Sequence, residues 1–191
     1  WLIFNDSLDI WFYNSKKDTF QRKTYGSATN KKYQVLSCNY SSYNLVWNFS
    51  TERNIENYND ILVKWHSLNF ETEGLCLINE NSEIINLFET TDHLDQIKRS
   101  KSKFSYLKER VNSPPALYIY DSFSGTEKLV YQSNENDSLA KEVVSNYIEW
   151  INKDGDIRGA LIRFPMKYDP KLKYPAIFSI YEKRSHVRNL Y

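Results

Sequence analysis

The part of this sequence that most restricts its fold is its last quarter, residues 147–191. Two runs rich in strand-forming residues, 147–152 and 157–164, flank the sequence KDGD at 153–156. An Asp-Gly pair between two such runs is the strongest short-range hairpin signal, and a type I′ turn requires positive φ at both central residues. We therefore expect a β-hairpin with a type I′ turn at this position.

The sequence after the hairpin is a connection marked by three prolines. Pro165 is expected to end the second strand, because proline cannot donate a hydrogen bond to the sheet. Pro170 and Pro175 keep the residues before them extended. The nearly unbroken apolar run at 176–181 then predicts a strand buried on both faces, as in a mostly parallel sheet.

In this order, the hairpin, the connection and the apolar strand resemble one junction of the prolyl oligopeptidase and dipeptidyl peptidase IV family, where the β-propeller joins the α/β-hydrolase domain. The residues that carry the resemblance are Trp150, Asp154, Gly155, Gly159, Pro165, Tyr168, Asp169, Pro170, Lys173, Tyr174, Pro175 and Tyr181. Most of the family has a glycine-rich turn after this last tyrosine. Here the sequence at 182–185 is EKRS, similar to the Tyr-Glu-Lys turn of some bacterial branches, which indicates a subfamily.

The sequence before this junction predicts a series of short strands. We expect them at 1–4, 9–13, 32–39, 44–49, 60–67, 74–79, 83–89, 103–111, 116–120 and 127–132. A spacing of about 8–15 residues is typical of a sandwich or a propeller rather than of βαβ units. Residues 55–59 and 93–98 are expected to be polar connections with at most one turn of helix.

Two of these strands resemble propeller strands of the same family. The sequence DSLDIW at 6–11 resembles its recurring D-x-x-DIW strand, and SPPALYIYD at 113–121, followed by Gly125, resembles its final-blade hairpin. In residues 10–13, Ile10 and Phe12 face one way and the two aromatic residues between and after them face the other. A strand that is apolar on both faces is expected where blades stack.

The predicted fold class is therefore mainly β: a partial β-propeller followed by the first strands of an α/β-hydrolase domain. A four-stranded blade takes about 40–45 residues, so residues 1–146 provide about three to four late blades. The polar linker at 134–146 carries one helical turn near 139–144, and residues 147–191 are the truncated start of the hydrolase domain. Because the sequence opens with Trp1 instead of methionine, we expect a piece of a longer protein with further blades upstream.

The sequence contains no complete catalytic triad of the type that this fold uses. A nucleophilic serine would lie on a G-x-S-x-G elbow, followed by an acid and a histidine. Of the five glycines, only Gly155 and Gly159 have the required separation, and the residue between them is Ile157. We therefore expect the nucleophile, acid and base beyond Tyr191, and the 191-residue segment alone to be inactive.

Tyr181 is the one residue to which the resemblance gives a catalytic role. In the related enzymes, a tyrosine at the end of this strand donates its hydroxyl to the oxyanion of the tetrahedral intermediate. A fixed donor directed at developing charge is worth about 2.7–4 kcal/mol in kcat. The competing interpretation is an ordinary aromatic residue at a strand end.

The histidines and cysteines are expected to be structural. His66, His93 and His186 are solitary and lack the spacing of a metal site. Cys38 and Cys76 lie within strand-like runs and are expected to be buried thiols, although a disulfide stays open because spacing alone does not decide it.

Net charge gives no case for nucleic acid or a membrane surface as partner. The formal net charge is +1, and the basic run at 98–103 is expected to be a solvated loop. No stretch of the sequence has the length and apolar character of a membrane-spanning helix.

Two functions follow from this reading. The first is a fragment of a serine peptidase whose parent hydrolyses short peptides, near proline, without a cofactor or metal. The alternative is a non-catalytic β-propeller or sandwich that binds peptides or proteins and has a degenerate hydrolase-like tail. A G-x-S-x-G elbow downstream of Tyr191 would favour the first. Dipeptidyl-, oligo- and acylaminoacyl-peptidase specificity, a homo-oligomeric parent and an exported or periplasmic location stay open.

Overall fold

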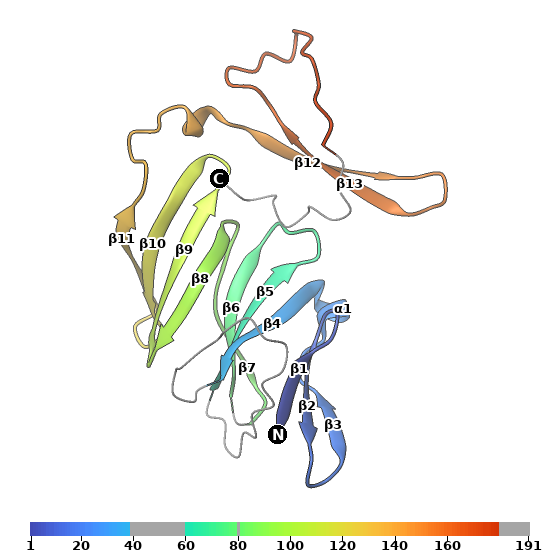
Figure 1. Ribbon diagram of the computed structural model, residues 1–191, viewed down its shortest axis with the longest axis vertical. Helices are drawn as coiled ribbons and strands as arrows, with labels where there is room; N and C mark the ends of the chain where they lie inside the picture. The colour runs from blue at the N-terminus through green and yellow to red at the C-terminus, as the bar shows by residue number, and fades with distance from the viewer. Residues whose placement is uncertain (39–59, 80, 180–191) are drawn as a thin grey trace. The chain divides into compact units, whose positions relative to one another are not determined.

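The computed structural model describes residues 1–38, 60–79 and 81–179 (Figure 1). The expected strand at 44–49 and the connection at 55–59 lie outside these residues. The chain forms two units, Trp1–Thr90 and a second unit that begins at Thr91, and each is described by itself.

The first unit contains two antiparallel sheets in which neighbouring strands follow one another in the sequence. Sheet A consists of β1 (Leu2–Asn5), β2 (Ile10–Asn14) and β3 (Thr19–Arg22). Sheet B consists of β4 (Lys31–Cys38), β5 (Asp60–Ser67), β6 (Glu73–Asn79) and β7 (Ile84–Thr90). The short helix α1 (Gly26–Thr29) lies between β3 and β4 in the sequence.

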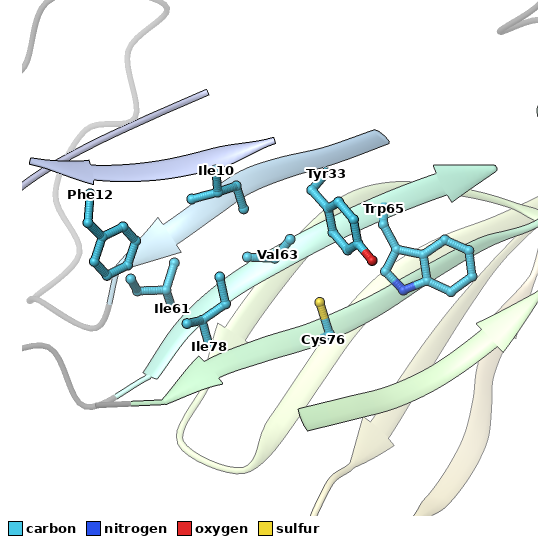
Figure 2. Packing of buried hydrophobic residues seen from close by; sticks show 8 residues of the cluster. All are labelled: Ile10, Phe12, Tyr33, Ile61, Val63, Trp65, Cys76 and Ile78. Carbon is cyan, nitrogen blue, oxygen red and sulfur yellow. The ribbon is translucent and has the colours of Figure 1, made fainter. Parts of the chain in front are cut away.

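The core of the first unit lies between one face of sheet A and one face of sheet B (Figure 2). Ile10 and Phe12, alternate residues of β2, are fully buried in it. Sheet B contributes Tyr33, Ile61, Val63, Trp65, Cys76 and Ile78. The predicted alternation along β2 thus places its aliphatic and phenyl side chains in a sheet-on-sheet core.

The second unit contains a third antiparallel sheet and a separate hairpin. Sheet C consists of β8 (His93–Ser100), β9 (Lys103–Arg110), β10 (Ser113–Asp121) and β11 (Thr126–Gln132). A single 3₁₀ turn, η1 (Ala140–Glu142), lies in the predicted linker. The hairpin pairs β12 (Ser145–Ile151) with β13 (Ile157–Arg163).

The predicted fold class is confirmed: the described chain is mainly β, built from antiparallel sheets in the manner of a partial β-propeller. Among the residues that the structure describes, three sheets of three, four and four strands precede the hairpin β12–β13. The boundary between residues 146 and 147 as a domain boundary stays a prediction.

Two expectations about sheet C were wrong. Residues 93–98, expected to be a polar connection, belong to strand β8, whose pairing with β9 buries Leu94. The basic run at 98–103 is the end of β8, a turn with Lys101 at φ 54°, and the start of β9. A strand whose side chains are mostly polar shows little hydrophobic alternation, and backbone pairing with its neighbour decides its conformation.

Candidate functional site

The loop of hairpin β12–β13 differs from the type I′ turn that we expected. Only Gly155 has positive φ, at 86°, and the N–H of Gly155 donates to the carbonyl oxygen of Asn152 at 3.1 Å. The N–H of Asn152 donates to the carbonyl oxygen of Asp156 at 2.9 Å, so the loop has three residues, as in a turn followed by a glycine bulge. The Asn152 side chain sets this longer loop, since its Oδ1 accepts from the N–H groups of Asp154 and Asp156.

Gly159 is required by the packing of this hairpin. A Cβ atom at Gly159 would overlap the phenol ring of Tyr147, which crosses over it from the other strand. The sequence marked Gly159 only by resemblance, and the structure supplies the physical reason: the tyrosine needs the space that a side chain would fill.

The connection after β13 folds into a compact run of aromatic rings. The ring of Tyr168 lies 4.4 Å from that of Phe164 and 5.3 Å from that of Tyr174, centroid to centroid. Asp169 and Pro170 open a turn that is closed by the N–H of Leu172 donating to the Asp169 carbonyl at 3.0 Å. The Tyr174 hydroxyl accepts from the N–H of Asp169 at 2.9 Å. Tyr168, Asp169 and Tyr174 therefore contact one another through ring packing and a hydrogen bond. These contacts fix the path of the chain toward residue 176.

The apolar run after this connection is not a strand over its described residues. Residues 176–179 belong to no strand, and Ile177 and Phe178 are 98% and 85% exposed. A strand needs neighbours that take up its backbone hydrogen bonds, and a run buried on both faces needs covering layers as well. Neither is supplied by the described part of the chain, so the predicted strand is wrong for residues 176–179 in this segment.

The principal predicted site residue, Tyr181, lies outside the described residues, as does His186. The backbone of Cys38 belongs to β4, and its side chain is outside the described part. The structure therefore neither assembles nor separates these side chains.

The remaining predicted residues lie within strands. Cys76 is a fully buried free thiol, and burial raises its pKa to about 12, which makes it a poor nucleophile. His66 stacks on Phe70 with 4.2 Å between ring centroids, and burial lowers its pKa. His93 opens β8. Among the described residues, no group of three His, Cys, Asp or Glu side chains could hold a metal ion.

A buried polar cluster around Asp9 went unrecognised in the sequence. The carboxylate of Asp9 accepts from the Thr24 hydroxyl at 2.8 Å and the Gly26 N–H at 2.6 Å, and it forms an ion pair with Arg22. The Thr24 hydroxyl in turn accepts from the N–H of Ile10 at 2.9 Å. The D-x-x-D spacing could have indicated this cluster, but its partners come from residues 13 to 17 positions later.

The first carboxylate of that motif has a different environment. Asp6 is exposed and accepts from the N–H groups of Asp9 and Leu8 and from the indole N–H of Trp11. These hydrogen bonds, with that of Asp9 the largest, lower the pKa of Asp6. The two aspartates therefore close the loop between β1 and β2 and fix the end of β3 and the start of α1 beside it.

A hollow of about 490 Å³ lies at the base of the hairpin, lined by Glu142, Val144, Phe164, Pro165, Lys167 and Tyr168. Its lining combines one carboxylate and one ammonium group with apolar side chains, and it holds no serine, cysteine or histidine. This lining contains no side chain of the kinds that act as serine or cysteine nucleophiles or as a histidine base in hydrolases. No described helix has the length and hydropathy to cross a membrane.

Comparison with solved structures relates this fold to part of a larger enzyme. One similar structure is a prolyl endopeptidase from a study of two such enzymes and of the role of inter-domain dynamics in their catalysis and specificity. It superposes with a TM-score of 0.57 at 7% sequence identity. The match covers 84% of this chain and 22% of the endopeptidase chain. The described chain is similar in fold to part of a prolyl endopeptidase. No protein-family model matches the sequence, and no curated protein matches it.

The AtxE2 isopeptidase gives weaker superpositions. Its variant with Astexin3-dC4 bound has a TM-score of 0.48 at 12% identity, over 87% of this chain and 31% of its own. Its ligand-free form has a TM-score of 0.47 at 12% identity over the same shares. The chain thus spans about a fifth to a third of the length of these structures.

Proposed function

We propose that this chain is part of a serine peptidase of the prolyl oligopeptidase and dipeptidyl peptidase IV family. In this proposal it supplies the late sheets of a β-propeller and the start of an α/β-hydrolase domain. The nucleophile, acid and base of the catalytic triad lie beyond Tyr191.

The observation that carries the proposal is the order of the elements. Three antiparallel sheets are followed by hairpin β12–β13 and by a connection in which Tyr168 and Tyr174 pack together. This order combines with a fold similar to part of a prolyl endopeptidase. Within the hairpin, Gly159 leaves the space that the ring of Tyr147 occupies.

Tyr181 is the proposed oxyanion donor. In the complete protein, residues 176–181 form a strand once the remainder of the hydrolase sheet covers Ile177 and Phe178, which are exposed in this segment. The hydroxyl at the carboxyl end of that strand then faces the position where a tetrahedral intermediate forms, since α/β sheets bind ligands at this end. The EKRS sequence that follows replaces the family's glycine-rich turn, so this proposal assigns the oxyanion contact to the tyrosine hydroxyl and none to the backbone of that turn.

The proposed substrates are short peptides cleaved near proline, with the propeller limiting access to small substrates. The test is hydrolysis by the full-length protein of two matched chromogenic peptides that differ only in proline or alanine at the cleavage site. We expect turnover of the proline peptide in clear excess over the alanine peptide. If the full-length protein hydrolyses neither these peptides nor other short peptides, the proposed peptidase activity is wrong. That result would favour the alternative, a non-catalytic binding module.

A further inference from the structure

The indole N–H of Trp65 is a buried hydrogen-bond donor for which the described part of the chain supplies no acceptor. Trp65 is 2% exposed and lies on β5 in the core between sheets A and B. Buried N–H groups in native proteins are nearly always paired with a protein acceptor or with an ordered water, because burial removes their hydrogen bonds to bulk solvent. This N–H therefore requires an acceptor other than the described protein groups.

The groups beside the indole ring define the place that this N–H faces. The Lys31 ammonium lies over the ring, 3.3 Å from its centroid, and an ammonium has no lone pair with which to accept. Gly74 packs against the ring close to Cε2, the atom bonded to Nε1, and has no side chain to offer. Tyr33 is the cross-strand partner of Trp65, and Figure 2 shows the Tyr33 hydroxyl and Cys76 on the side of the indole that carries the nitrogen.

The Tyr33 hydroxyl can accept a hydrogen bond on this side. The Thr29 hydroxyl donates its single proton to the carbonyl oxygen of Tyr25 at 2.9 Å. In the pair between Thr29 and Tyr33, whose hydroxyl oxygens are 3.3 Å apart, the Tyr33 hydroxyl is therefore the donor. Burial raises the pKa of Tyr33, so its proton stays in place at neutral pH. The lone pairs of the Tyr33 oxygen are left to accept.

A donor on Trp65 and an acceptor on Tyr33 that are neighbours without a direct hydrogen bond fit the two ends of one water molecule. The water oxygen accepts from the indole N–H, and one water proton is donated to the Tyr33 oxygen. The second water proton has the sulfur of Cys76 as a weak acceptor. Buried waters typically make about three hydrogen bonds to polar groups that would otherwise be unpaired, which is the number that these three side chains offer.

We propose that Trp65, Tyr33 and Cys76 form a binding site for one buried water molecule in the core between sheets A and B. The water accepts from Trp65 Nε1 and donates to Tyr33 Oη. It links β5 and β4 to helix α1, because the Tyr33 hydroxyl in turn donates to Thr29. The site is independent of the proposed peptidase activity.

The test is a crystal structure of the full-length protein at a resolution that shows single ordered waters. We expect one water about 2.7–3.2 Å from Trp65 Nε1 and within hydrogen-bond distance of Tyr33 Oη. In Tyr33→Phe the site loses its best acceptor, so the density for the water should be lost while the Trp65 ring stays in place. The matched control is Tyr13→Phe, which removes a hydroxyl outside this core that donates to Asp18 and should leave the water unchanged.

Three outcomes would overturn the proposal. A protein group within hydrogen-bond distance of Trp65 Nε1, from any part of the full-length chain, would give the donor a different partner. An indole N–H packed only against carbon atoms would show a donor that stays unpaired. Undiminished density for the water in Tyr33→Phe would show that Tyr33 is not its acceptor. Peptidase activity has no part in this readout, so its result is distinguishable from the failure of the proposed function.

Discussion

At the scale of single residues, two glycines set how closely large rings pack. A Cβ atom at Gly74 would lie 2.5 Å from the ring of Trp65 and 2.6 Å from the carbonyl oxygen of Phe88. Gly159 gives the same space to Tyr147. At these two positions, glycine is needed because another group packs closely against its Cα. Gly155 differs, because it has open space around it and adopts a positive φ that other residues rarely adopt.

We predict that Gly74→Ala destabilises the full-length protein by about 1–3 kcal/mol, because the added methyl group is forced against a buried ring and the backbone of β7. Urea denaturation measures this change. The matched control is Gly155→Asn, which should alter stability little, since asparagine tolerates positive φ and nothing lies within 4 Å of the new Cβ. Equal stability of Gly74→Ala and the parent would contradict the packing at Trp65.

For the proposed oxyanion donor, we predict that Tyr181→Phe in the full-length protein lowers kcat on the order of 10²–10³-fold, since one donor to the transition state is removed while the ring remains. KM should change little, because the hydrogen bond is made chiefly in the transition state. Steady-state kinetics with the proline peptide supply both constants. A kcat within about threefold of the parent would remove Tyr181 from the oxyanion hole.

At the scale of elements, the positions of most strands marked by apolar residues were predictable, although the apolar run at 176–179 belongs to no strand. Strand β5 (Asp60–Ser67) has the predicted bounds, and most other strands differ by a few residues. Strand β8 was missed because only Leu94 on it is buried, so its pattern reads as polar. The turn in hairpin β12–β13 was misassigned because the Asn152 side chain, outside the Asp-Gly pair, selects a three-residue loop.

The cluster around Asp9 fixes the relation of β2, β3 and α1. We predict that Asp9→Ala destabilises the full-length protein strongly, by roughly 1–3 kcal/mol for each buried donor left without an acceptor. The Thr24 hydroxyl and the Gly26 N–H are those donors. Asp6→Ala should cost less, because the exposed donors around Asp6 can bond to water. Thermal unfolding of the two variants gives the comparison, and equal losses would contradict the assignment of Asp9 as the buried anchor.

At the scale of the whole molecule, the sequence predicted a chain of antiparallel sheets followed by a hairpin, and this fold class is confirmed. The described residues do not test the catalytic assignment, since we propose that the nucleophile, acid and base lie beyond Tyr191.

We propose that this chain is the non-nucleophilic part of a serine peptidase. The most direct measurement is mass spectrometry after treatment with a fluorophosphonate, which reacts covalently with an activated serine. We predict one adduct on the full-length protein, at a serine downstream of Tyr191 within a G-x-S-x-G elbow, and no adduct on residues 1–191 expressed alone. An adduct on a serine within residues 1–191, or none on the folded full-length protein, would contradict the claim.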